Sequence, residues 1–180
     1  MSGDPLQTRL WADADVFVAF SLATAQPANV DAVFPAGWSQ VGLLDGDDGF
    51  EEGHDQDKSA HFAWGGIQIK TGRAHDAFTY KFSALEDNDA TFRLWRPGST
   101  RNGDIVVPRP EQIQIGFETR EGDVVHRLLS ANYAEVDIDG AVTHNEKDPS
   151  KLQFIATIYP DASVSPAVVW HEQTTETPGS

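Results

Sequence analysis

The stretch that decides the fold is residues 37–97, which read GWSQVGLLDGDDGFEEGHDQDKSAHFAWGGIQIKTGRAHDAFTYKFSALEDNDATFRLWRP. Phe78, Tyr80 and Phe82 stand at every second position, which is the spacing of side chains on one face of a β-strand. An acidic, glycine-containing segment precedes this strand, and a short charged segment follows it and ends at Pro97. The order of these parts predicts a β scaffold that carries one long loop and one helix.

The acidic segment from Asp45 to Asp57 contains seven acidic residues and neither lysine nor arginine. Such a composition cannot bury enough apolar surface to order itself, so the sequence predicts a long loop over residues 45–60. Its opening resembles the start of a calcium loop. An EF-hand, however, needs an oxygen ligand at its fifth position and glycine at its sixth, where this chain has Gly49 and Phe50. The pattern favours a solvated acidic loop.

A short helix is predicted after the aromatic strand. Asp87 or Asn88 can cap its start, Arg93 and Arg96 oppose the helix dipole at its end, and Pro97 stops it. Its apolar positions match those of the strand, so we expect the helix to cover the sheet. The core predicted beneath it consists of Phe78, Tyr80, Phe82, Phe92 and Trp95.

Outside this stretch the sequence predicts further strands. Val16, Val18 and Phe20 alternate near the start, and Ile113, Ile115 and Phe117 alternate in the second half. The predicted fold class is mainly β, an antiparallel two-sheet sandwich or half-barrel with one short α-helix. The predicted organisation is an N-terminal arm at 1–15, one β-sandwich domain at 16–172 and a flexible tail at 173–180.

Composition narrows the function classes. The 180 residues include 28 acidic and 13 basic ones, and the net charge of −15 argues against general nucleic-acid binding, since phosphate contacts need lysine and arginine. The chain has no cysteine, which excludes disulfides and favours a reducing compartment. The start lacks a signal-peptide pattern, and the apolar runs are too short to span a membrane.

We find no pattern of a catalytic or metal site. The six histidines are scattered, and His171-Glu172 lacks the second histidine of a zinc helix. P-loop, nucleophile-elbow and dinucleotide-binding patterns are also missing from the sequence. Trp38, Trp64 and Trp95 lie in strand or helix patterns, which favours core packing over a sugar platform. We therefore expect no catalytic residue, no metal ion and no cofactor, and a protein that is not an enzyme.

The central stretch resembles the major tail proteins that form the tail tube of siphophages. Members of that family show, in order, a Trp-x-x-x-Gly strand, an acidic loop, a Trp-x-Gly strand, an alternating aromatic strand and a Leu-Glu-x-Asn helix start. The matching parts of this sequence are Trp38–Gly42, Asp45–Asp57, Trp64–Gly66, Phe78–Phe82 and Leu85–Asn88. Abundant alanine, aspartate and glycine beside few lysines and isoleucines points to a phage of actinobacteria.

The resemblance implies a structural virion protein. It implies homohexameric rings that stack into a hollow tube, in which strands of neighbouring copies join into a barrel around a DNA channel. Genomic DNA would pass through without specific binding. Further implied partners are the tape measure protein, the tail terminator and distal tail or baseplate proteins, with no membrane involved. The protein would assemble in the host cytoplasm and reside in the virion tail.

Two assembly roles follow for particular residues. The acidic loop is expected to become ordered between rings, with Phe50 as the anchor in a neighbouring copy. The channel wall is expected to be net negative, because lysine–phosphate contacts would resist sliding. The loop residues are Asp45, Asp47, Asp48, Phe50, Glu51 and Glu52, and the candidate lining residues are Gln112, Gln114 and Glu118.

Three alternatives remain open at this point. Another component with the same fold, such as a tail terminator or a baseplate hub protein, would share the same sequence features. A carbohydrate-binding β-sandwich would show its tryptophans as an exposed stripe. A small hydrolase would need a site that the sequence does not reveal.

Overall fold

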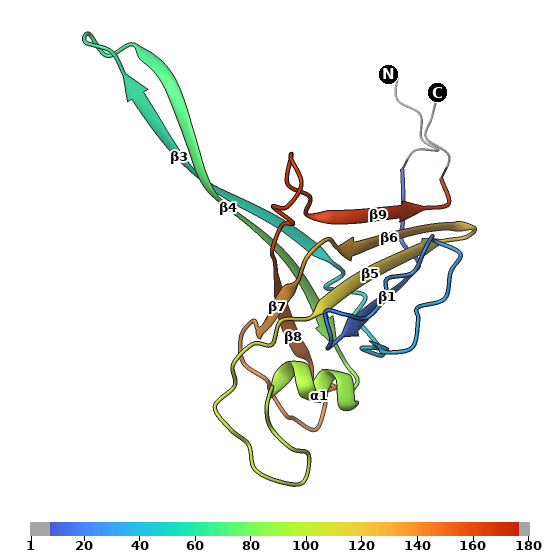
Figure 1. Cartoon of the computed structure of the whole chain (residues 1–180). Helices are drawn as coiled ribbons and strands as arrows, with labels where there is room; N and C mark the ends of the chain where they lie inside the picture. Colours follow the sequence, from blue (N-terminus) through green and yellow to red (C-terminus); the bar gives the residue numbers. More distant parts are fainter. Residues whose placement is uncertain (1–7, 177–180) are drawn as a thin grey trace.

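The protein is described by a computed structural model over residues 8–176, apart from the side chains of Arg73 and His75 (Figure 1). The predicted arm and tail lie partly outside this range, at 1–7 and 177–180. Inside it, β1 already begins at Asp13, and Gln173 and Thr174 belong to β9. The predicted boundaries at 15 and 173 are therefore wrong, because pairing with β5 and β6 orders these polar residues.

Two antiparallel sheets pack together. The first has the strand order β2-β1-β5-β6-β9 and the second has the order β3-β4-β8-β7. The predicted sandwich with one short helix is confirmed, and the sheets stay open and do not close into a barrel. The elements are β1 (Asp13–Ala19), β2 (Trp38–Gln40), β3 (Glu51–Phe62), β4 (Gln68–Ala84), α1 (Asp89–Trp95), β5 (Gln114–Glu121), β6 (Val124–Ser130), β7 (Ala134–Ile138), β8 (Leu152–Ile158) and β9 (Trp170–Thr174).

The core lies between the two sheets, where alternate side chains of each strand meet. Register brings apolar residues opposite one another, with Val16 across from Phe117 and Phe82 across from Phe154. The Phe117 ring lies 4.1 Å from that of Tyr80 and 5.7 Å from that of Phe82, both on the other sheet. These contacts across the interface join the two sheets, as the period-two spacing predicts.

Helix α1 is placed by its N-cap. The side chain of Asn88 accepts hydrogen bonds from the backbone N–H groups of Ala90 and Thr91, and the Thr91 hydroxyl accepts one from the Asn88 N–H. The amide of Asn88 also donates to the carbonyl of Val41 at 2.8 Å. This bond ties the helix start to the sandwich, and Ala90, Thr91 and Leu94 then face inward.

The core predicted under the helix falls into two groups. Tyr80 and Phe82 are buried, and Phe78 is half-buried with its ring stacked on that of His54 at 4.5 Å. Phe92 and Trp95 are only half-buried, and their rings lie under the guanidinium groups of arginines. The expected helix face is confirmed for Trp95, which packs against the core, and is wrong for Phe92, because the cap turns Thr91 and Leu94 inward.

The predicted loop over 45–60 is wrong in its second part. Residues Asp45 to Gly49 form a turn, but β3 begins at Glu51 and pairs with β4 along its whole length, from Glu51 opposite Lys81 to Phe62 opposite Gln68. A polar segment that cannot order itself gains backbone hydrogen bonds when it lies beside a longer strand. Figure 1 shows that this hairpin extends far beyond the sandwich.

Replacing Phe82 by alanine should lower the free energy of unfolding by about 3–5 kcal/mol, because the buried ring contacts aromatic residues of both sheets. Phe92→Ala should cost less, since its ring is half-exposed. Phe62→Ala, at the exposed end of the hairpin, serves as the control and should stay within about 0.5 kcal/mol. Urea unfolding measures all three, and a Phe82→Ala variant as stable as the parent would contradict this assignment of the core.

Candidate functional site

The outer face of the five-stranded sheet is covered by the chain's own residues 20–37. The Gln114 side chain donates hydrogen bonds to the carbonyls of Leu22 at 3.0 Å and Thr24 at 2.8 Å. Phe34 lies on the same face and stacks on Phe17 with 3.9 Å between ring centroids. This face of the sheet is therefore an internal contact and is closed to other molecules.

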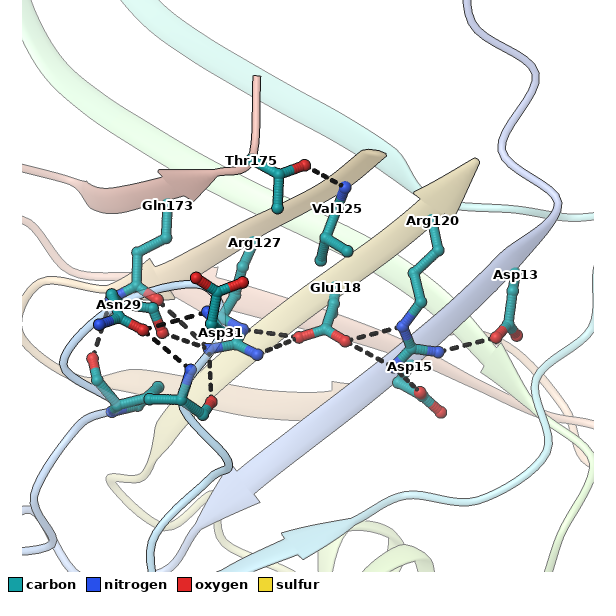
Figure 2. Close-up of polar contacts among 12 residues, drawn as sticks. Asp13, Asp15, Asn29, Asp31, Glu118, Arg120, Val125, Arg127, Gln173 and Thr175 are labelled. Atoms are coloured by element: carbon teal, nitrogen blue, oxygen red, sulfur yellow. Dashed lines mark hydrogen bonds and ion pairs between the residues drawn. The ribbon is translucent and has the colours of Figure 1, made fainter. Parts of the chain in front are cut away.

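An ion-pair network holds the covering segment in place (Figure 2). Glu118 lies opposite Arg127 on β6 and opposite Asp15 on β1, so strand register brings the charges together. The Nε of Arg127 donates to Glu118 at 2.6 Å, and its Nη1 donates to the carbonyls of Asn29 at 3.1 Å and Ala32 at 3.2 Å. The Arg127 guanidinium also lies over the Phe34 ring.

The network continues to the edge of the sheet through Arg120. Its guanidinium binds Glu118, Asp15 and Asp13. Partial burial disfavours the charge on Arg120, but the hydrogen bonds that its guanidinium donates to the three carboxylates outweigh this effect and raise its pKa. The three acids and two arginines are thus paired within this chain and are not free to bind a ligand.

The predicted channel-lining residues do not form one exposed surface. Gln114 and Glu118 are only 4% and 5% exposed, while Gln112 is exposed at the start of β5. The prediction is wrong for Gln114 and Glu118. Apolar and polar side chains alternate along β5 as the sequence predicts, but residues 20–37 cover the polar side of this strand.

The outer face of the four-stranded sheet lies open. Where β4, β7 and β8 pair, the outward charged side chains are Lys81, Glu135 and Asp137, and Glu51 follows on β3. Lys81 forms an ion pair with Asp139 at 2.9 Å, and the hydrogen bond that its ammonium group donates to that carboxylate raises the lysine's pKa. The open face is therefore net acidic.

The residues of the acidic turn contact their own chain. Lys151 pairs with Asp45 and Asp48 at 3.0 Å each, and its hydrogen bond lowers the pKa of Asp45. The Ser83 hydroxyl donates to Asp48 at 2.6 Å and is the main cause of the lowered pKa of that carboxyl group. Asp47 is exposed.

Phe50 is half-buried rather than free. Its ring lies 5.3 Å from Phe117 and 5.6 Å from Tyr80, inside the subunit. Phe50 thus packs against its own chain with part of its ring and lines an open cleft with the rest, and its role as an anchor in a neighbouring copy stays a prediction. Glu51 and Glu52, the last two predicted loop residues, lie exposed at the start of β3.

Four of the exposed large apolar side chains lie at the end of the β3–β4 hairpin, namely Phe62, Trp64, Ile67 and Ile69. Trp64 is fully exposed, so the prediction that it packs in a core is wrong. The Gly65-Gly66 pair, which forms the hairpin turn with positive φ at both positions, is the sequence signal that places Trp64 at a tip.

Beside the base of this hairpin lies a cleft of about 900 Å³. Its walls come from the N-terminal segment, the residues between β2 and β3, and the ends of β3 to β6, and they include Leu10, Trp11, Leu43, Phe50, Glu52 and Glu86. The described part of the chain contains no group of three or more side chains that could hold a metal ion. It also contains no helix that is long and apolar enough to cross a membrane.

Arg127→Met should lower the free energy of unfolding by about 1–3 kcal/mol, because it removes one of the two arginine partners of the buried Glu118 and leaves that carboxylate with Arg120 alone. The double variant Arg127→Met with Glu118→Gln should recover part of this loss. Arg93→Met is the matched control, since it breaks an exposed pair with Glu111 and should cost about 1 kcal/mol or less. Urea unfolding tests the series, and equal costs for Arg127→Met and Arg93→Met would show that the network is not what holds the segment.

Comparisons with known proteins bear on what these surfaces do. Comparison with curated proteins gave no match. The sequence model of one family, described as phage tail tube protein, matches residues 1–179, nearly the whole chain. The chain belongs to the phage tail tube protein family.

Proposed function

We propose that this protein assembles as stacked hexameric rings into the tail tube of a siphophage, the conduit through which DNA reaches the host. The observation that carries the proposal is the difference between the two sheets. One outer face is covered by residues 20–37, whereas the other is open and net acidic. A tube subunit needs one such face for its channel.

Strand edges support the assembly of a ring. In the described chain, β3 and β7 are the two edges of the four-stranded sheet. An exposed edge presents unpaired N–H and C=O groups that another strand can bind. If β7 of one copy pairs with β3 of the next, six sheets join into one barrel whose inner wall is the open acidic face.

The charge of that wall suits the passage of DNA. Glu51, Glu135 and Asp137 point away from the core, and Lys81 is neutralised by Asp139. Such a wall offers phosphates no free cation, so DNA slides without releasing counterions to bind. This assignment replaces the lining residues expected on β5.

The remaining roles belong to the same proposal. The tape measure protein would occupy the channel before DNA, a terminator would close one end of the tube, and distal tail or baseplate proteins would nucleate the other. Assembly would take place in the host cytoplasm. The tryptophans give no support to a carbohydrate-binding module, since Trp64 lies at the hairpin tip and Trp170 packs against Tyr80 and Phe117.

Electron microscopy of the purified protein tests the tube directly. Raising the protein concentration, or adding a preformed tail tip, should give tubes of uniform diameter with six-fold end views. Monomers that never assemble, and that are stabilised against heat by a sugar, would instead support the carbohydrate-binding alternative.

Reversing the charge of the open face should make the channel retain DNA. In Glu51→Lys with Asp137→Lys, tubes assembled in the presence of short DNA should hold nuclease-resistant DNA that high salt releases. The control pair Asp31→Lys with Asp123→Lys changes the same charge at exposed positions in the covering segment and in the β5–β6 turn, and DNA bound there should be digested. Nuclease-resistant DNA in the control but not in the first pair would place the channel on the other sheet.

A further inference from the structure

The first half of β1 has a neighbouring strand on one side only. β1 pairs with β5 over its whole length, whereas β2 pairs only with the last three residues of β1. Next to these pairs, the Val41 N–H donates a hydrogen bond to the Val16 carbonyl at 2.8 Å. Before Val16, residues 13–15 of β1 therefore have an open edge on the side opposite to β5.

This edge stays open because the chain crosses to the other sheet directly after β2. The Leu43 carbonyl accepts a hydrogen bond from the Leu85 N–H at 2.9 Å, and the Asp45 N–H donates one to the Ser83 carbonyl at 2.9 Å. These two bonds hold the backbone after β2 beside the end of β4. It consequently cannot continue along β1.

Backbone groups of Ala14 point to the open edge. The Val16 carbonyl faces the side of β2, and Ala14, two residues earlier in the same strand, faces that side as well. The Ala14 N–H donates to the side chain of its neighbour Asp13 at 2.9 Å, within β1 itself. An open edge of this kind offers N–H and C=O groups to which an extended peptide can add as a further strand.

The cleft of about 900 Å³ opens at this edge, since Ala14 is among its lining residues. Thr119, opposite Ala14 on β5, also lines the cleft, and its buried hydroxyl oxygen has no hydrogen-bond partner within the described residues. Leu43, which is 71% exposed, and the half-buried Phe50 give the cleft an apolar wall. A cleft of this size suits a short peptide segment.

The uncompensated charge of the cleft is negative. Arg120 and Lys151 neutralise the aspartates on its walls, and Arg9 is paired with Glu121 and Glu176. Glu52 and Glu86 also line the cleft, with no ion pair to a cation of the described chain. A ligand that complements this wall brings basic groups.

The protein offers few basic groups of its own for this purpose. Most lysines and arginines of the sandwich already form ion pairs within the chain, namely Lys81, Arg93, Arg101, Arg120, Arg127 and Lys151. A second copy of such an acidic chain is repelled by the cleft rather than attracted. The charge therefore favours a different protein as the partner.

We propose that the open edge of β1 binds an extended, cationic segment of a different protein. The segment adds to the five-stranded sheet beside Ala14, where β2 ends. Its apolar side chains lie against Leu43 and Phe50, and its basic side chains lie near Glu52 and Glu86. The proposal concerns the single subunit and does not rest on the assembly of a tube.

Fluorescence anisotropy with a labelled peptide of alternating lysine and valine tests the site on the dilute, unassembled full-length protein. Glu52→Lys should weaken binding by about tenfold, because it places a cation beside those of the peptide. Glu51→Lys is the matched control, since it makes the same change on the other face of β3 and should alter binding by about threefold or less. A parent protein that does not bind the peptide, or binds equally well a peptide with glutamate in place of lysine, would overturn the proposal.

Ala14→Pro tests the pairing of the backbone. Proline removes the N–H at the open edge, and the hydrogen bonds to β5 come from the residues on either side, so the urea midpoint should stay and peptide binding should be lost. A peptide whose N–H groups along one edge are N-methylated tests the same pairing on the parent protein and should not bind. Tight binding of that peptide, or of the original one by Ala14→Pro, would show adsorption by charge alone and refute strand addition. Displacement of the peptide by rising concentrations of the protein itself would assign the edge to a second copy instead.

Discussion

Both faces of β5 are buried. The arrangement of the rest of the chain depends on the ring contacts made on the inner face and on the polar contacts made on the outer face. On the inner face, the Phe117 ring contacts Tyr80, Phe82, Phe50 and Trp170 and so joins the two sheets. On the outer face, the amide of Gln114 and the carboxylate of Glu118 bind partners that hold residues 20–37 in place. Because polar groups buried there must all be paired, this covering segment has one stable position.

Closing one sheet leaves the other as the surface through which the protein can act. The four-stranded sheet keeps its outer face and two edge strands available, and its longest strands extend past the sandwich as a hairpin. The edges, the open face and the projecting hairpin of this molecule are different surfaces. Contacts between different surfaces join copies head to tail into rings or filaments, whereas contacts between identical surfaces give a dimer. This asymmetry fits a member of a tube-forming family.

The charged groups of the protein also differ between the interior of the sandwich and its open surfaces. Many acidic groups of the sandwich are neutralised within the chain, as Asp45 and Asp48 are by Lys151 and Glu118 is by Arg127. The uncompensated acids that remain on the open sheet, and Lys58 and Lys70 toward the end of the β3–β4 hairpin, therefore give these two surfaces charges of opposite sign. A large negative net charge also keeps free subunits soluble until they assemble.

The sequence by itself determined the local structure of this protein. The alternation in β1, β4 and β5 and the start of α1 at Asn88 follow from side-chain spacing and capping groups, which act over a few residues. Only the tertiary structure decided that a polar segment forms β3, that Gln114 and Glu118 are buried, and that Phe50 is inside while Trp64 is outside. Those outcomes depend on hydrogen bonds and contacts between residues distant in the sequence, because a strand's polar side faces water only when no other segment covers it.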